Sequence, residues 1–358
     1  MRGKRFVYGS YRGRRSTTDV LKTIALILAV LVVLAVAGVW MAQKYIVYDD
    51  GGYHLELPFF QKKGPAQEPE DLRVAVEPAA SQPEETPEEG EPLLAAVTVP
   101  LSAVEDGSAE ALAAQAGANS VLLDMKTDRG QLGFISQLAM AASAGVNAGQ
   151  ADINRQLQAL NSGELYTVAR LSCFRDHALA KDETYAIRTN SGYRWTDPEE
   201  LRWSSPASQA VQDYLVALMV ELAQLGFDEI LLDNAGYPVD GNLDYIVRND
   251  AYDSALFPAT VRGFYTDLVQ RLEEQYPEVV LSVVTDRDTL EAATSEESGQ
   301  TLSGMAERMD RIWVRDLGAA WTQCVQLLDE AGLSRPEVNL VSIDTQAGVS
   351  DRSWCLWP

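Results

Sequence analysis

The sequence predicts an α/β fold, a (β/α)₈ TIM barrel without an obvious final helix, over residues 93–358. After residue 93, eight short β-rich segments alternate with helical patterns, as expected for β–α–β units on a parallel sheet. The length of this region matches the roughly 250 residues that such barrels use. Hydrophobic residues make up 46% of the chain and charged residues 23%, so apolar material suffices for a sizeable core. A doubly wound open sheet is the structural alternative.

The strands are predicted from runs of β-branched, aromatic and aliphatic residues. They cover residues 95–100, 120–125, 166–173, 228–233, 279–284, 311–315, 338–343 and 353–357. Between the third and fourth runs, Ser205 can cap a helix with Pro206 at its first position, and Gly226 ends it. One face of this helix carries the apolar residues Val211, Leu215, Leu218, Leu222 and Leu225.

Two further helices have clear boundaries in the sequence. One starts at Pro258 and ends before Pro277, and the other carries Trp321 and ends at Gly332. No helical pattern follows the eighth strand. Another segment must therefore cover the outer face of that strand, or the face stays exposed.

The N-terminal region predicts a membrane anchor. Residues 1–22 contain a basic cluster, and residues 24–42 within a predicted transmembrane helix at 23–43 are uncharged and apolar. Nineteen residues at 1.5 Å each span roughly the 30 Å hydrocarbon layer. Positive charge before the span places the N-terminus in the cytoplasm and the C-terminal domain outside the cell. Cleavage as a signal peptide near Ala35 is the alternative, and it gives the same compartment.

Residues 44–92 separate the anchor from the barrel. Residues 44–60 are aromatic-rich and are interpreted as a single strand or a membrane-proximal collar. Residues 61–92 are rich in Pro and Glu and cannot bury enough apolar surface to fold, so we expect a disordered, extended linker.

Composition narrows the functional classes. The net charge of −23 argues against a nucleic-acid partner, which needs a concentrated basic face. Cys173, Cys324 and Cys355 are too widely spaced for a zinc pattern and are expected to be buried thiols. His54 and His177 lie far apart without neighbouring ligand residues. We therefore predict no metal ion and no cofactor.

Carboxylates at the ends of the predicted strands are the catalytic candidates, because the β–α loops of a barrel form one functional rim. Asp233 closes an apolar strand and shares a face with Leu231 and Glu229. Asp286 and Asp288 follow the next strand. Two carboxylates across a sugar-sized cleft can hydrolyse a glycosidic bond, one as proton donor and the other as nucleophile or base.

Other residues of the same rim are predicted to bind substrate. Asp124 is expected to stay ionised beside Lys126, which suits substrate holding, and Asp344 is expected to stabilise positive charge on a sugar ring. Loop tryptophans either stack on sugar faces or plug the top of the barrel. The predicted substrate-binding residues are Asp124, Lys126, Arg175, Trp195, Trp203, Asn234, Asp344 and Trp357.

Glu229 is predicted to lie deep inside the barrel, where a carboxylate needs a partner. Arg170 is about equally far into the preceding strand. The two are therefore expected to form a structural ion pair.

The segment from the third to the fourth strand resembles a family of glycoside hydrolase domains from Gram-positive bacteria, which are membrane-anchored or secreted. The resemblance covers residues 120–238 and rests on several short stretches. These are residues 168–171 and 174–176, Trp195, Asp197, Pro198, Tyr214, Glu221 and residues 226–230 through Asp233 to Pro238. It implies a TIM barrel distantly similar to amylase-type glycosidases, with Asp233 as nucleophile, Asp286 or Asp288 as acid and Asp344 as stabiliser.

The sequence departs from this family at two strand ends. Residues 234–237 replace a family stretch that contains an arginine, and residues 313–316 lack a Tyr-Pro pair. The resemblance therefore implies a site that lacks one expected cation. The predicted function is hydrolysis of a cell-wall or extracellular polysaccharide by a membrane-anchored enzyme. The alternative is a catalytically inactive barrel that binds glycan or protein at the cell envelope.

Overall fold

A computed structural model describes residues 46–49, 52–55, 93–345 and 351–357. Before the barrel, β1 (Ile46–Asp49) pairs antiparallel with β2 (Gly52–Leu55). The sequence predicted a single strand or a membrane-proximal collar at residues 44–60, and this stretch contains two strands. Among the described residues no helix is long and apolar enough to cross a bilayer, and the span predicted at residues 23–43 lies outside them.

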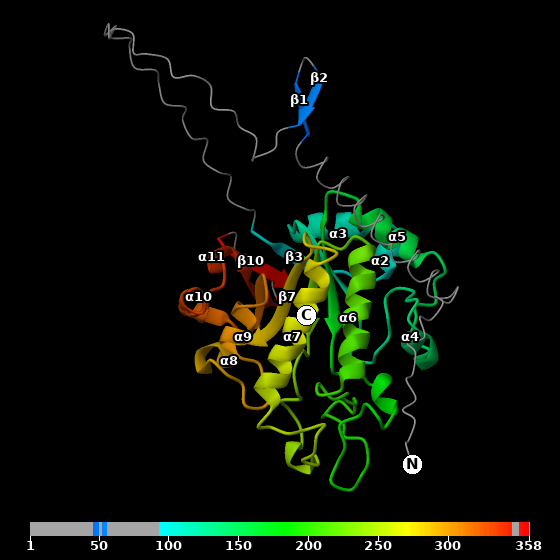
Figure 1. Ribbon diagram of the computed structural model, residues 1–358, viewed down its shortest axis with the longest axis vertical. Coiled ribbons are helices and arrows are strands. Elements are labelled where there is room, and N and C mark those ends of the chain that lie inside the picture. Colours follow the sequence, from blue (N-terminus) through cyan, green and yellow to red (C-terminus); the bar gives the residue numbers. More distant parts are fainter. Residues whose placement is uncertain (1–45, 50–51, 56–92, 346–350, 358) are drawn as a thin grey trace, which may run out of the picture. The chain divides into compact units, whose positions relative to one another are not determined.

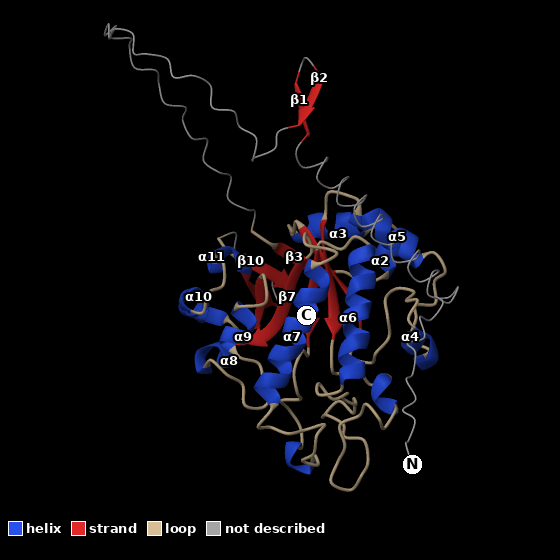
Figure 2. Ribbon diagram, viewed as in Figure 1, coloured by secondary structure: helices blue, strands red, loops and turns tan. Residues whose placement is uncertain are grey.

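The C-terminal region is a closed barrel of eight parallel strands, which confirms the predicted TIM barrel and rules out the open sheet. Helices surround the strands in Figures 1 and 2. The strands follow chain order around the barrel, and the last strand pairs with both its predecessor and the first. They are β3 (Ala95–Thr98), β4 (Ser120–Lys126), β5 (Tyr166–Ser172), β6 (Glu229–Asp233), β7 (Val280–Asp286), β8 (Arg311–Arg315), β9 (Leu340–Asp344) and β10 (Ser353–Leu356).

The helices connect the strands and form the outer layer. They are α2 (Ser102–Glu105), α3 (Ala109–Ala116), α4 (Ala139–Ala144), α5 (Ile153–Asn161), α6 (Gln209–Gln224), α7 (Phe257–Glu273), α8 (Arg287–Ala292), α9 (Leu302–Ala306), α10 (Trp321–Glu330) and α11 (Pro336–Asn339). The 3₁₀ turns within the described residues are η1 (Leu179–Lys181), η2 (Leu243–Tyr245) and η3 (Gly318–Ala320). Figure 1 shows the long loops that follow β5 and β6 gathered at one end of the barrel, beyond the carboxyl ends of the strands.

The α6 helix starts later than the sequence predicts. Its N-cap is Ser208 instead of Ser205. The Ser205 hydroxyl instead accepts a hydrogen bond from the Ala207 amide and donates one to the Ala251 carbonyl, which ties two rim loops together. The predicted apolar face of α6 is buried, and Gly226 follows it with a φ of +87°, as its predicted role as terminator requires.

Alternation along the strands divides the core into two layers. Side chains that point to the barrel axis, such as Leu122, Val168, Leu231 and Trp313, form an inner cluster. Residues of opposite parity pack under the helices in a larger outer cluster. The three cysteines are free and buried, as predicted.

The short α11 helix covers part of the outer face beside the last strand. It contacts β8, β9 and β10. Trp354 alternates with the inward-facing Cys355, so it faces outward from β10, and its side chain is only 5% exposed. This face therefore does not need a helix after β10 to be buried.

Candidate active site

Asp233 ends β6 at the mouth of the barrel. It has the same parity as Leu231 of the inner cluster, so its side chain faces the axis, as predicted. The residue is 4% exposed. An almost fully buried carboxylate needs strong partners, because burial without them would cost several kcal/mol or protonate the group.

Two arginines supply those partners. Arg170 of β5 donates from Nε and Nη2 to Asp233 Oδ2 at 3.0 and 2.6 Å. Arg315 at the end of β8 donates from Nη2 to both carboxylate oxygens at 3.1 and 3.0 Å. Burial raises the pKa of Asp233, but the charges of Arg170 and Arg315 together outweigh it, and the pKa lies below its ordinary value. Asp233 is therefore a fixed, ionised carboxylate.

Stability should depend on the ionisation of Asp233 at acid pH. A carboxyl group with a lowered pKa in the folded state stabilises the protein above its unfolded pKa of about 3.9, and this contribution is lost as pH falls through the folded value. We expect the difference in free energy of unfolding between the native chain and Asp233→Asn to be constant above about pH 5 and to shrink below about pH 4. Chemical denaturation across this range measures it. A difference independent of pH would contradict the assignment, and the exposed Asp329→Asn serves as control.

Arg170 also joins Asp233 to two other carboxylates. Its Nη1 lies 2.9 Å from Asp124 Oδ1, and its Nη2 lies 2.6 Å from Asp128 Oδ1. Burial raises the pKa of Asp124 above its ordinary value, and the charge of Arg170 opposes this only in part. Asp124 and Asp233 thus share one guanidinium but have pKa values displaced in opposite directions. This pattern is typical of carboxylates that divide acid and base roles.

Arg175 is held by a second set of acidic groups. Its Nε lies 2.7 Å from Asp197 Oδ2 and its Nη1 2.8 Å from Asp128 Oδ2, while its Nη2 contacts Glu199 at 3.2 Å. The Arg175 side chain is 15% exposed. Arg175 therefore orders the mouth and presents little free surface to a ligand.

Trp357, just beyond β10, lies against both arginines of Asp233. The centre of its ring is 4.6 Å from the Arg315 guanidinium carbon and 5.3 Å from that of Arg170. Such contacts contribute about 0.5–2 kcal/mol each. In this arrangement Trp357 holds the cations in place, whereas the sequence predicted a role in substrate binding.

A cavity of about 140 Å³ opens beside Asp233. Its lining includes Asp233, Asn234, Arg315 and Trp203, together with Asp286 from the end of β7. Asn234 has a φ of +49°, and its amide donates to Ser172 Oγ at 2.9 Å. The cavity therefore brings together four residues that the sequence predicts for this site and adds Arg315.

The two carboxylates predicted after the fifth barrel strand differ in position. Asp286 lines the cavity, is exposed, and caps α8 by accepting from the Thr289 amide at 2.6 Å. Asp288 is 82% exposed in the first turn of α8 and pairs with Arg287 at 2.9 Å. Asp286 is thus the member of the pair that can reach a ligand near Asp233.

The prediction that Lys126 accompanies Asp124 in the cleft is wrong. A register shift between Asp124 and Lys126 pairs Lys126 with Leu171, whose side chain belongs to the outer layer. Lys126 is fully buried and forms an ion pair with Asp176 at 2.9 Å. This bulge turns the ammonium away from the barrel axis.

Two other residues predicted to bind substrate, Asp344 and Trp195, are not part of the lining of the Asp233 cavity. Asp344 has the opposite parity to the inward-facing Ile343, so it leans toward the outer layer. Trp195 is 2% exposed and donates from Nε1 to the Asn242 carbonyl at 3.1 Å. Trp195 therefore packs within the rim loops, as in the alternative of tryptophans that plug the barrel top.

Glu229 is fully buried inside the barrel, but its partner is not Arg170 as predicted. It pairs with Arg311 of β8 and accepts hydrogen bonds from Tyr166 and from Trp313 Nε1 at 3.0 and 2.8 Å. Arg170, two residues before the end of β5, instead reaches Asp233. The barrel interior therefore holds two separate ion-pair networks, one at each end.

Asp128 and Arg315 contact the arginine and the carboxylate at the centre of the site but are not among the residues that the sequence predicts for it. Arg170 was predicted to pair with Glu229 and pairs with Asp233 instead. Arg315 is one of the two cations that contact Asp233. Its position at the end of a predicted strand was a usable signal, because strand ends meet at the rim. Asp128 lies in a loop, where no periodicity marks it.

A closed parallel barrel of eight strands defines the TIM-barrel class, and the buried carboxylate, the flanking arginines and the small cavity at its C-terminal mouth form a candidate site on the rim. The chain belongs to the family described as "Putative glycosyl hydrolase domain", whose model matches residues 105–329, well over half of the sequence. No curated protein matches the chain.

Solved structures with a similar fold include a hypothetical protein from Ruminiclostridium thermocellum. It has 23% identity and a TM-score of 0.45, with 52% of this chain and 96% of that chain covered. The α-galactosidase of Lactobacillus brevis has 13% identity and a TM-score of 0.46, with 75% and 38% covered. An α-galactosidase of Geobacillus stearothermophilus has 9% identity and a TM-score of 0.43, with 73% and 38% covered. This chain thus spans 38% of the length of both α-galactosidases.

Proposed function

We propose that this protein is a membrane-anchored glycoside hydrolase that acts on a cell-wall or extracellular polysaccharide, with Asp233 as nucleophile and Asp286 as proton donor. One observation carries the proposal: an ionised, nearly buried Asp233 lines the same cavity as the exposed Asp286. Two carboxylates on one cleft are the chemical requirement for glycoside hydrolysis.

In the first step, the Asp233 carboxylate attacks the anomeric carbon while the glycosidic C–O bond breaks. Asp286 donates its proton to the departing oxygen, which leaves as an alcohol. The burial of Asp233 leaves little room for an intervening water, which favours direct attack over activation of water. In the second step, Asp286 takes a proton from water as the water attacks the glycosyl ester and frees Asp233.

The arginines support both steps. Arg170 and Arg315 keep Asp233 charged, so that a nucleophile is present, and fix the orientation of its oxygens. They also make Asp233 a weaker base and therefore a better leaving group in the second step. This electrostatic arrangement is built before substrate binds, as efficient catalysis requires.

Asp124 is the competing proton donor, because its pKa is raised and its side chain is 41% exposed. The two candidates can be separated by leaving-group dependence. An acid catalyst matters most when the leaving alcohol is a poor one, and its loss costs about 10²–10⁴-fold. We expect Asp286→Asn to lose this factor on oligosaccharides but little on aryl glycosides with activated leaving groups. If Asp124→Asn shows that pattern and Asp286→Asn does not, the donor is Asp124.

A silent glycan- or protein-binding barrel remains the other function to test. Incubation of the chain with a broad panel of α- and β-linked polysaccharides, followed by assay of reducing ends, decides between them. If the native chain releases reducing ends and the Asp233→Asn variant does not, the result supports the hydrolase. Binding without release by the native chain supports the silent barrel.

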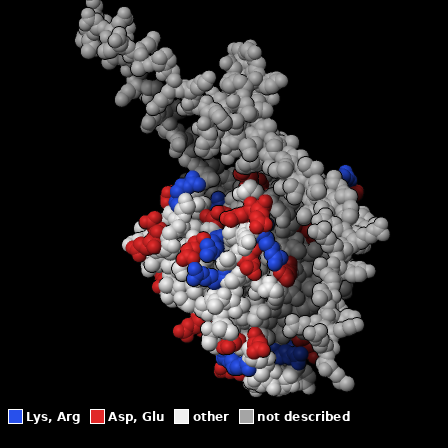
Figure 3. Space-filling model, viewed as in Figure 1, with Lys and Arg blue, Asp and Glu red and all other residues white. Residues whose placement is uncertain are grey.

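Location at the membrane is proposed from the apolar run at residues 24–42 and the basic residues before it. Acidic and basic side chains are interspersed on the face of the barrel in Figure 3, without a continuous basic patch in that view. Such a face suits a carbohydrate ligand better than a phosphate backbone. Protease treatment of intact cells, which should degrade the barrel while the N-terminus stays protected, tests the orientation.

A further inference from the structure

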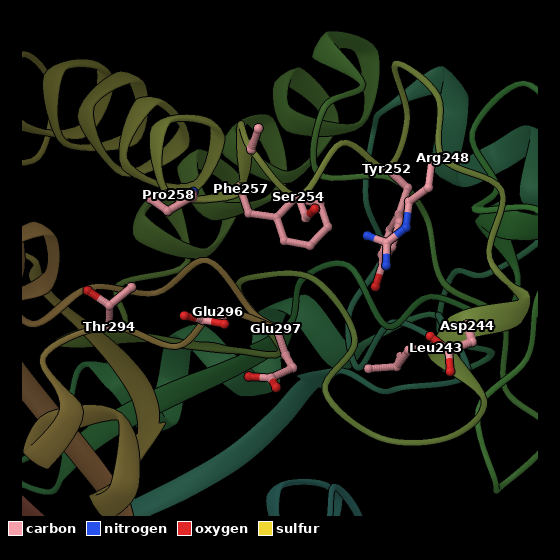
Figure 4. Close-up of a pocket in the computed structure, with 11 residues that line it drawn as sticks. Leu243, Asp244, Arg248, Tyr252, Ser254, Phe257, Pro258, Thr294, Glu296 and Glu297 are labelled. Atoms are coloured by element: carbon pink, nitrogen blue, oxygen red, sulfur yellow. The ribbon is translucent and has the colours of Figure 1, made fainter.

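A second cavity of about 590 Å³ lies at the rim of the barrel, outside the Asp233 site (Figure 4). It falls in the size range of sites for small ligands. Its walls come from the loop between β6 and α7, from the first turn of α7 and from the segment between α8 and α9. The lining residues are Leu243, Asp244, Arg248, Tyr252, Ser254, Ala255, Phe257, Pro258, Thr294, Glu296 and Glu297.

The two cavities share a wall made by one pair of aromatic rings. Tyr237 lines the Asp233 cavity and stacks on Phe257, which lines the second cavity; their ring centroids are 3.6 Å apart at an angle of 18°. The segment between α8 and α9 also joins them, because Ser298 lines the first cavity and Glu297 the second. The two cavities are therefore neighbours, separated by this buried pair, in which Tyr237 is 2% and Phe257 1% exposed.

The polar groups of the second cavity suit a sugar without negative charge. Figure 4 shows Glu296 and Glu297 on one side and the guanidinium of Arg248 on the other. Arg248 lies over the Tyr252 ring at 5.2 Å, and within the described part of the chain no ion pair joins Arg248 to a carboxylate. The cavity thus offers hydrogen-bond donors and acceptors that are not neutralised by each other. The cavity lining carries three carboxylates, including that of Asp244, and one guanidinium. This excess of negative charge disfavours acidic sugars.

Exposed apolar side chains gather in the same region. Tyr193, Val239, Tyr245 and Leu256 are the large hydrophobic residues with the highest exposure among those described, at 54–75%. Three of them lie in the loop between β6 and α7. Exposed apolar surface concentrated at a rim is typical of a binding surface, and aromatic faces pack on the CH groups of sugars.

We propose that the second cavity is an accessory sugar subsite, which holds a neutral or amino sugar of the same glycan chain whose next units reach Asp233. The proposal rests on the function proposed above and extends it, because it makes the substrate a polymer without acidic groups. Arg248 and Glu297 hydrogen-bond the sugar from opposite sides. The glycan chain passes over the segment that carries Ser298 of the first cavity and Glu297 of the second, and the buried rings of Phe257 and Tyr237 lie beneath it.

Binding to an array of immobilised oligosaccharides tests this proposal. The array holds neutral glucans, galactans and mannans, chitosan oligomers and acidic galacturonans, each graded from disaccharide to octasaccharide. The probe is the full chain with Asp233→Asn, which binds without turnover, compared with the same chain carrying Arg248→Ala and Glu297→Ala. Both added changes are on exposed residues, so the fold should be retained. A chain carrying Arg155→Ala and Glu330→Ala, also exposed, is the matched control.

We expect the cavity variant to bind longer neutral or amino oligosaccharides about 10–100-fold more weakly, because it has lost hydrogen bonds from charged groups. Its affinity for disaccharides should be unchanged. The control should bind like the parent. Equal binding by the cavity variant and the parent, binding restricted to acidic glycans, or no binding by the parent to any non-acidic oligosaccharide would each overturn the subsite. Hydrolysis of the same compounds by the native chain is scored separately. If the native chain hydrolyses none of these compounds, but the cavity variant still binds the longer oligosaccharides more weakly, the hydrolase proposal is rejected and the subsite proposal stands.

Discussion

Replacement of Asp233 by Asn should reduce hydrolysis of oligosaccharides by about 10⁴-fold, the scale seen when a nucleophile or its partner is removed from an enzyme. The amide of Asn has nearly the same shape as the carboxylate but cannot attack the anomeric carbon. Steady-state assay of reducing ends on native and variant chains measures the effect. Binding of an oligosaccharide should change far less than turnover, because the cavity walls remain.

The same substitution also removes a charge from a buried network, so folding must be measured in parallel. Breaking a buried ion pair costs about 3–5 kcal/mol. In the variant, Arg170 retains its ion pairs with Asp124 and Asp128, and Arg315, which is 42% exposed, can be solvated by water. We therefore expect the free energy of unfolding to fall by an amount near the lower end of this range. A variant that is folded, binds oligosaccharide and still hydrolyses within tenfold of the native rate would remove Asp233 from catalysis.

Replacement of Glu229 by Gln should have the largest effect on stability. Glu229 is fully buried, and its charge is balanced by Arg311. The neutral variant leaves this arginine without a counter-charge inside the barrel, which costs about 3–5 kcal/mol. At roughly 2–4 °C per kcal/mol for a domain of this size, the melting temperature should fall by about 10 °C. Thermal unfolding followed by circular dichroism checks this value.

Activity distinguishes a structural role of Glu229 from a catalytic one. Glu229 begins β6 and Asp233 ends it, so the two carboxylates lie at opposite ends of the strand. Below its melting temperature, the Gln variant should hydrolyse oligosaccharides at the native rate. The exposed Glu330→Gln should change stability by less than about 0.5 kcal/mol. If the Glu229→Gln chain has the same melting temperature as the native chain, the desolvation cost of the buried ion pair equals the stability that its attraction contributes.

Much of the fold follows from local patterns in the sequence. Each strand is a short run of apolar residues, and each was placed within two residues of its observed start. The start of α6 was misplaced because serine is a favoured N-cap residue at either position, 205 or 208. The Ser205 hydroxyl instead donates to the Ala251 carbonyl, which is 46 residues away, and the helix begins after Ser208. A local pattern carries no information about such a partner.

The site was predicted in part, for a similar reason. Alternation places Asp233 and Asp286 correctly because both strands are regular up to their ends. It fails at Lys126, since one extra residue in β4 reverses the direction of every later side chain. The partner of Glu229 was wrong because Arg311 lies two strands away around the barrel, and long side chains reach across the interior. Arg170 is on the neighbouring strand β5, which made it the nearest candidate in the sequence.

The pairing of β10 with β3 has a consequence for how the protein is made. Ser353 accepts a hydrogen bond from the Leu94 amide, so the contact joins segments 259 residues apart. During translation β3 emerges long before its neighbour exists, and contacts of such high sequence separation form late in folding. Trp357, which contacts Arg170 and Arg315, follows β10 directly and is synthesised with it. In a nascent chain the mouth of the barrel around Asp233 is therefore not assembled until β10 has been synthesised and has closed the barrel.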